Sequence, residues 1–195
     1  MDRPFFEVFS NLTVDKDLES FLENASISKV ATNANRDSMR IYMECNDLVP
    51  KRRIWKLEEE IKKQYFSRQN LNVNIIEKFR LSEQYNSEKL YEIYKDSILE
   101  EIYRNSSVLF GLLKKADFHF VDGQTLEITL EDIFLAHQSE PEICLILYKI
   151  FQDRCGQDLR ITFQYKDTEK SKYLENSNKV IDNLVHSIVK RYDSL

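Results

Sequence analysis

The sequence carries the same order of predicted secondary structure twice. From residue 17 to 79 the spacing of apolar side chains predicts a short helix, two strands, a long helix and a third strand. The same order recurs from residue 106 to 165. In each copy an acidic stretch follows the hairpin, and a proline, Pro50 or Pro141, is expected to open the long helix. We therefore predict the α+β fold class, with two tandem α-β-β-α-β units whose three-stranded sheets pack on helices.

Composition excludes several classes of protein. The 195 residues include only three glycines, which argues against Gly-rich phosphate loops, and a net charge of −5 argues against a surface that grips nucleic acid everywhere. Cys45, Cys144 and Cys155 have no C-x-x-C spacing and lie in apolar contexts, so we expect reduced, buried thiols. We find no signal peptide and no apolar run long enough for a membrane span. We expect a cytoplasmic protein that binds no membrane.

The repeat predicts three segments. We expect a first domain at residues 1–82, a second at 83–167, and a polar linker with an amphipathic helix at 168–195 that leads to a further domain. A helix from Ser87 to about Arg104 should present one apolar face, formed by Leu90, Tyr94, Ile98 and Ile102. The second long helix, residues 141–155, is apolar nearly all round, so we expect it to be covered on more than one side.

The first long helix, residues 51–66, provides the candidate binding surface. Opposite and beside its apolar stripe lie the candidate nucleic-acid or partner residues Lys51, Arg52, Arg53, Trp55, Lys56, Lys62 and Lys63. One interpretation is a nucleic-acid contact, with cations for phosphates and an aromatic ring for stacking. The other is an ordinary solvated face. In that case its cations pair with nearby glutamates, and Trp55 packs under the Phe5, Phe6 and Phe9 segment.

Catalytic and metal-binding patterns are missing from the sequence. His119, His137 and His186 stand alone, without ligands at metal-binding spacing, and we expect structural or surface roles for them. The acidic group of Glu127, Glu131 and Asp132 is expected to be a solvated strand end. We find no nucleotide-binding or nucleophile motif and predict no catalytic residues, no metal, no cofactor and no small-molecule substrate.

Three stretches resemble a known family in sequence and in order. They are RRIWKLEEEIKKQYFSRQNLNVNIIEKFRLSEQY, LYEIYKDSILEEI and LYKIFQDRCGQDLRITFQY. Together they resemble the N-terminal region of PolC-type DNA polymerase III α subunits, the replicases of low-GC Gram-positive bacteria. The likeness runs from about residue 30 to 165 and spans the first and second N-terminal domains of that family.

The resemblance implies a fold and a place in DNA replication. The first domain would be similar to type II KH modules and to the polymerase-binding domain of the clamp-loader τ subunit, and the second is a suggested nucleic-acid contact. Polymerase and 3′–5′ exonuclease activities would lie in the parent protein, outside this chain. A working KH module needs a G-x-x-G loop, and Gly111, Gly123 and Gly156 do not form one.

Three functions follow as hypotheses. The leading one is a non-catalytic module that docks other replisome proteins, with the clamp-loader τ subunit as the candidate partner, at the replication fork and nucleoid. The runner-up is an accessory module that binds single-stranded DNA through the basic helix face. The third is an unrelated adaptor with a coincidental likeness.

Overall fold

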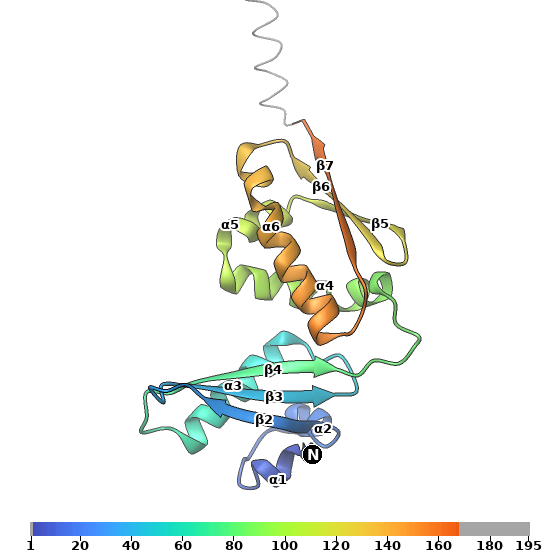
Figure 1. The fold of residues 1–195 in the computed structure, drawn as a ribbon. Helices are drawn as coiled ribbons and strands as arrows, with labels where there is room; N and C mark the ends of the chain where they lie inside the picture. Colours follow the sequence, from blue (N-terminus) through green and yellow to red (C-terminus); the bar gives the residue numbers. More distant parts are fainter. Residues whose placement is uncertain (1, 168–195) are drawn as a thin grey trace, which may run out of the picture.

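The computed structural model describes residues 2–167, which form two α+β units, each built around its own β-sheet (Figure 1). The predicted α+β fold class is confirmed. The predicted linker and helix at residues 168–195 lie outside the described residues. The first unit contains β1 (Arg3–Pro4), α1 (Phe5–Val8), α2 (Lys16–Leu22), β2 (Ser26–Thr32), β3 (Ser38–Cys45), α3 (Lys51–Tyr65) and β4 (Asn72–Phe79).

The second unit repeats this plan after a linking helix. Its elements are α4 (Ser87–Asn105), α5 (Ser107–Leu113), β5 (Asp117–Asp122), β6 (Thr125–Glu131), α6 (Phe134–Tyr148), the π-helix η1 (Lys149–Arg154) and β7 (Arg160–Lys166). Within the described part of the chain, no helix is both long enough and apolar enough to span a membrane.

The first sheet has the strand order β1-β2-β3-β4. β2 and β3 form an antiparallel hairpin, and β4 returns through α3 to lie parallel to β3. The prediction of three strands is wrong by one here, because the two-residue strand β1 pairs with the outer edge of β2. Burial along β4 alternates, so helices cover one face of this sheet and the other stays open.

The second sheet has the order β5-β6-β7, with the same antiparallel hairpin and parallel return. The predicted hairpin is present, but its two-residue turn is Gly123 and Gln124, one residue later than predicted, because Asp122 pairs with Thr125 as the last residue of β5. Asp122 stabilises the turn, because its Oδ1 accepts hydrogen bonds from the backbone N–H groups of Gln124 (2.8 Å) and Thr125 (2.7 Å). The two copies therefore share one strand order.

The two long helices begin differently. Pro50 immediately precedes α3, as expected, but Pro141 lies inside α6, which begins at Phe134. The helix continues through the proline because its buried stripe spans both sides of it, with Ala136 before and Ile143 and Leu147 after. We expected this helix to be covered on more than one side; at least one side is open, since Leu145 is 54% exposed.

Helix α4 joins the two units. Its predicted apolar face of Leu90, Tyr94, Ile98 and Ile102 is confirmed as buried. Near its middle the Tyr94 hydroxyl donates to the backbone carbonyl of Val49 in the first unit (3.1 Å), and at its start the Ser87 hydroxyl donates to that of Asp158 in the second (2.5 Å). The buried apolar residues of both units form one core cluster. The domain boundary at residues 82–83 stays a prediction.

Candidate binding surfaces

Lys51 does not belong to the basic surface of α3. Its side chain is buried, and its Nζ donates to Glu77 Oε1 at 2.6 Å. Its backbone N–H donates to the hydroxyl of Ser97 on α4 (3.1 Å). The helical wheel places Lys51 beside the basic residues, but the first turn of α3 is covered by α4, and a buried acid on β4 neutralises its charge.

The other cations of α3 are almost all engaged in ion pairs. Arg52 pairs with Glu100, Arg53 with Asp17, Lys56 with Asp15, and Lys63 with Glu60. Lys62 makes no ion pair among residues 2–167. The hydrogen bond from Lys56 lowers the pKa of Asp15, with a further contribution from the backbone N–H of Leu18. Because these cations are paired with acids, the positive electrostatic potential that would attract a polyanion is small.

The position of Trp55 matches neither of the two interpretations of the sequence. The guanidinium of Arg104 on α4 lies 4.6 Å from the centre of its ring, a cation–π contact. The phenylalanines that were expected to cover Trp55 pack elsewhere, with Phe5 against Phe6 and Phe9, and Phe9 against Tyr65. The ring therefore belongs to the junction between α3 and α4.

A buried charge cluster connects the two units. It consists of Lys51, Glu77, Glu101 and Arg154. Glu77 on β4 is wholly buried and accepts from Lys51 and from Arg154 Nη1 (3.0 Å), the latter at the end of η1. Arg154 also binds Glu101 of α4 through two hydrogen bonds, of 2.6 and 2.5 Å. The cluster thus joins β4 and α3 of the first unit to α4 and η1.

Electrostatics within this cluster favour the charged forms of Glu101 and Arg154. Burial acts to raise the pKa of Glu101, but the hydrogen bonds and positive charges of Arg154 and Lys51 outweigh it, so that this pKa is lowered. Burial likewise acts to lower the pKa of Arg154, and its acidic partners raise it above its usual value. The arginine therefore remains protonated, and the glutamate ionised, at neutral pH.

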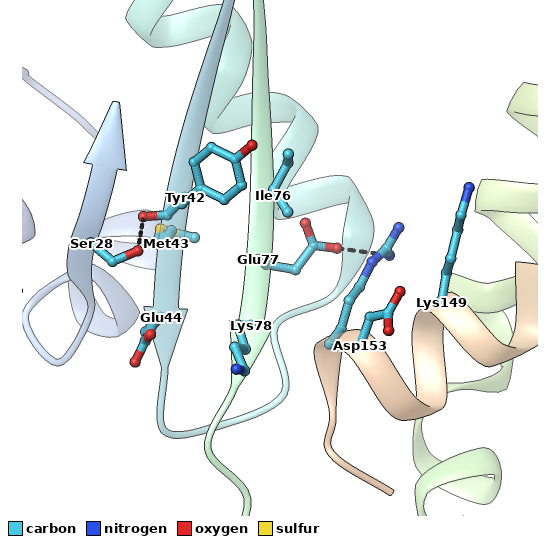
Figure 2. A pocket seen from close by; sticks show the side chains of 10 residues that line it. Ser28, Tyr42, Met43, Glu44, Ile76, Glu77, Lys78, Lys149 and Asp153 are labelled. Carbon is cyan, nitrogen blue, oxygen red and sulfur yellow. Dashed lines mark hydrogen bonds and ion pairs between the residues drawn. The ribbon is translucent and has the colours of Figure 1, made fainter. Parts of the chain in front are cut away.

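A hollow of about 480 Å³ opens beside this cluster, between the open face of the first sheet and η1 (Figure 2). Figure 2 shows Tyr42 and Ile76 on the neighbouring strands β3 and β4, with Lys149 and Asp153 across from them on η1. The hollow is lined by Ser28, Tyr42, Met43, Glu44, Ile76, Glu77, Lys78, Lys149, Asp153 and Arg154. Its size lies within the range of ligand-binding cavities.

A second hollow, the α4–α5 hollow, has a volume of about 670 Å³. It is lined by Arg52, Asp96, Leu99, Glu100, Tyr103 and Phe110. Tyr103 and Phe110 form an edge-to-face pair with ring centres 5.0 Å apart. Tyr103 is 62% exposed, so this surface presents an aromatic side chain to solvent.

The histidines and cysteines differ partly from expectation. His137 is not isolated, since its Nε2 lies 2.8 Å from Asp132 and its ring stacks on Tyr165. His119 is an exposed strand residue. His186 lies outside the described residues. Cys45 and Cys155 are buried, and burial raises the pKa of each thiol to about 12; Cys144 is only partly buried. Among residues 2–167 no group of His, Cys, Asp and Glu side chains is arranged to hold a metal ion.

Sequence reasoning missed Glu77, although a signal was present. β4 alternates strictly, and Val73, Ile75, Glu77 and Phe79 all occupy its inward positions. An acid in such a series predicts a buried cation partner. Lys51 was already among the candidate residues, but Arg154 lies 77 positions from Glu77, too far for a local pattern to reveal.

Comparison with known proteins concerns the first unit. Residues 4–75 match the family described as DNA polymerase III polC-type N-terminus I. No curated protein and no solved structure shows a significant match to the chain. The matched segment runs from the start of the first unit into β4, and the second unit lies outside it. Over this segment, the chain is therefore similar to the N-terminal region of PolC-type DNA polymerase III.

Proposed function

We propose that this chain is a protein-docking module of the bacterial replisome, acting as a non-catalytic N-terminal region of a PolC-type replicase. The observation that carries the proposal is the α4–α5 hollow, where the exposed ring of Tyr103 packs on Phe110. Aromatic side chains next to an arginine, here Arg52, are the composition of interface hot spots. The family match supports a replisome partner.

The junction between the units supports the same proposal. The α4–α5 hollow includes Arg52 of α3 in the first unit and Tyr103 of α4, so its shape depends on how α3 and α4 pack. The Arg52–Glu100 ion pair joins the two helices at the surface, and the hydrogen bond from the Lys51 backbone N–H to the Ser97 hydroxyl joins them further inside. A surface that is organised before binding loses less entropy when a partner docks.

The clamp-loader τ subunit is the first partner to test, because the family resemblance points to it. We propose to measure binding of the purified chain to the τ subunit and to other replisome proteins, at low and high salt and with and without DNA. Binding led by the aromatic rings of the α4–α5 hollow should change little with salt, whereas a contact led by phosphates weakens steeply.

A pair of variants tests the surface itself. Tyr103→Ala should weaken partner binding by about tenfold or more, as expected of a hot-spot aromatic. Ile93→Ser is the matched control, since Ile93 is 55% exposed on the same helix but does not line the α4–α5 hollow. Equal affinity of Tyr103→Ala and the wild-type chain would refute this docking surface.

The alternative function, binding of single-stranded DNA through the basic face of α3, has less support. Four of its cations are already paired and Lys51 is buried. Replacing Arg52, Lys56 and Lys63 by glutamate would abolish DNA binding at low salt if that face were the contact. We expect instead that this variant retains whatever DNA binding the wild-type chain has.

A further inference from the structure

The first sheet has a face that no described helix covers. We call it the open sheet face; it is formed by Lys29 on β2, Arg40 and Tyr42 on β3, and Asn74, Ile76 and Lys78 on β4. Register pairs Lys29 with Tyr42 and Tyr42 with Ile76, so these three form one row across the strands. Arg40 and Asn74 form the next row on one side, and Glu44 and Lys78 the row on the other. Side chains of one row lie about 5 Å from their neighbours.

The cations on and beside this face are free. Lys29, Arg40, Lys78 and Lys149 of η1 are all exposed, and none has a carboxylate within 4.0 Å among residues 2–167. This is the reverse of α3, whose basic residues are mostly paired. In a chain with a net charge of −5, four free cations around one face form a local positive patch.

The acids near this face are few, and two are already engaged. Glu44 pairs with Arg80, and Glu77 is neutralised by Lys51 and Arg154. Asp153 remains, on the η1 side of the hollow shown in Figure 2. A single carboxylate at that position can accept a hydrogen bond from an amino group of a base, while the surrounding cations contact phosphates.

An aromatic ring lies at the centre of the patch. Tyr42 is partly exposed, the Nζ of Lys29 lies 5.7 Å from its ring centre, and Ile76 extends the apolar surface across β4 with 37% exposure. The hollow of about 480 Å³ begins at these two side chains (Figure 2). Phosphate-binding cations around an aromatic ring are the features by which proteins hold unpaired nucleotides.

We propose that the open sheet face binds single-stranded DNA, with a base stacked on Tyr42 and the phosphate backbone contacted by Lys29, Arg40, Lys78 and Lys149. The face of an unpaired base can lie flat on a ring, whereas the bases of a duplex are stacked on one another. This inference does not rest on the proposed docking function, because the α4–α5 hollow shares no residue with the open sheet face.

The test is fluorescence anisotropy of a labelled oligothymidylate with the full 195-residue chain. The charge-reversal variant combines Arg40→Glu and Lys78→Glu, and its matched control combines Lys56→Glu and Lys63→Glu on α3. We expect the first to weaken binding at least tenfold at low salt and the control to bind within about twofold of the wild-type chain. Thermal unfolding of each variant verifies that it is folded.

Stacking and charge are tested separately. Tyr42→Phe keeps the ring and should bind like the wild-type chain, whereas Tyr42→Leu should bind about fivefold more weakly or worse. Four phosphate contacts predict a slope of about −3 in a plot of log affinity against log salt. The proposal is overturned by absence of binding at low salt, by equal affinity for a duplex of the same length, or by an equal loss of affinity in the α3 control. Tighter binding of the same sequence as RNA overturns the assignment to DNA.

Discussion

At the scale of single residues, Glu77 is a wholly buried carboxylate that two cations from other elements contact. Its Oε1 accepts from both Lys51 and Arg154, while its Oε2 is buried without a hydrogen-bond partner in the described part of the chain. A wholly buried carboxylate loses its hydration, and two cations recover part of that free energy. The free energy of unfolding should therefore be sensitive to any change at this side chain.

Glu77→Gln should lower the free energy of unfolding by about 3 kcal/mol, because it leaves Lys51 buried without a counter-charge. Urea unfolding followed by circular dichroism measures the change. The double variant Glu77→Leu with Lys51→Met removes both charges and should recover part of the loss. A single variant as stable as the wild-type chain would contradict the assigned role of this ion pair.

From the lowered pKa of Glu101 we predict that the folded chain loses stability in acid. Its pKa is lower in the folded protein than in the unfolded chain, so its contribution is complete above the unfolded value of about 4.3 and is lost as the pH falls through the lower folded value. Urea midpoints between about pH 7 and pH 3 should fall less steeply for Glu101→Gln than for the wild-type chain. Identical pH dependence of the two would show that this carboxylate does not contribute.

At the level of secondary-structure elements, α6 continues through a residue that normally interrupts helices. Pro141 has no N–H to donate to the carbonyl of His137, and its ring crowds that carbonyl. The helix nevertheless extends to Tyr148 and then changes to η1, which brings Arg154 to Glu77. Packing of the helix against its sheet therefore outweighs the tendency of proline to interrupt a helix.

Pro141→Ala should raise the free energy of unfolding by about 1 kcal/mol or more, because it restores a hydrogen bond within α6 and removes the crowding. Thermal unfolding measures the change. Pro50→Ala is the control, and it should have a smaller effect because Pro50 precedes α3 and interrupts no helical hydrogen bond. A lower melting temperature for Pro141→Ala would contradict this account.

Elements defined by local periodicity were predictable, and the partners of charged groups were not. The stripe of Leu90, Tyr94, Ile98 and Ile102 and the hairpin turn after Asp122 are encoded within a few residues, and the structure has both. The pairing of Arg52 with Glu100 joins separate elements, so it depends on tertiary packing. For that reason the sequence suggested that cations of this face pair with nearby glutamates, but it did not reveal the partners outside α3, which are Glu100, Asp15 and Asp17.

For the whole molecule, α4 and the buried charge cluster couple two units that repeat one plan. Arg154 contacts Glu77 of the first unit and Glu101 of α4 at once. Trp55, the single tryptophan of the chain, lies against Arg104 in the same junction. Its fluorescence therefore reports on the contact between α3 and α4, while circular dichroism reports on all helices.

In the wild-type chain the two signals should give one coincident urea transition, as expected when one core unfolds cooperatively. In Arg154→Ala the tryptophan signal should change at lower urea than the circular dichroism, because the junction opens before the units unfold. Arg80→Ala, a change at an exposed cation, should leave the two transitions coincident. Coincident transitions in Arg154→Ala would show that the cluster does not couple the units.

One consequence concerns the outer edge of β4, the last strand of the first sheet. The backbone N–H of Ile75 donates to Glu58 Oε1 at 2.7 Å, and the Arg154 guanidinium contacts the same strand at Glu77. Such contacts block the addition of a further strand, whether from a second copy or from an extended peptide. A partner at this edge must then recognise side chains rather than extend the sheet, and replacing Glu58 would expose a site for self-association.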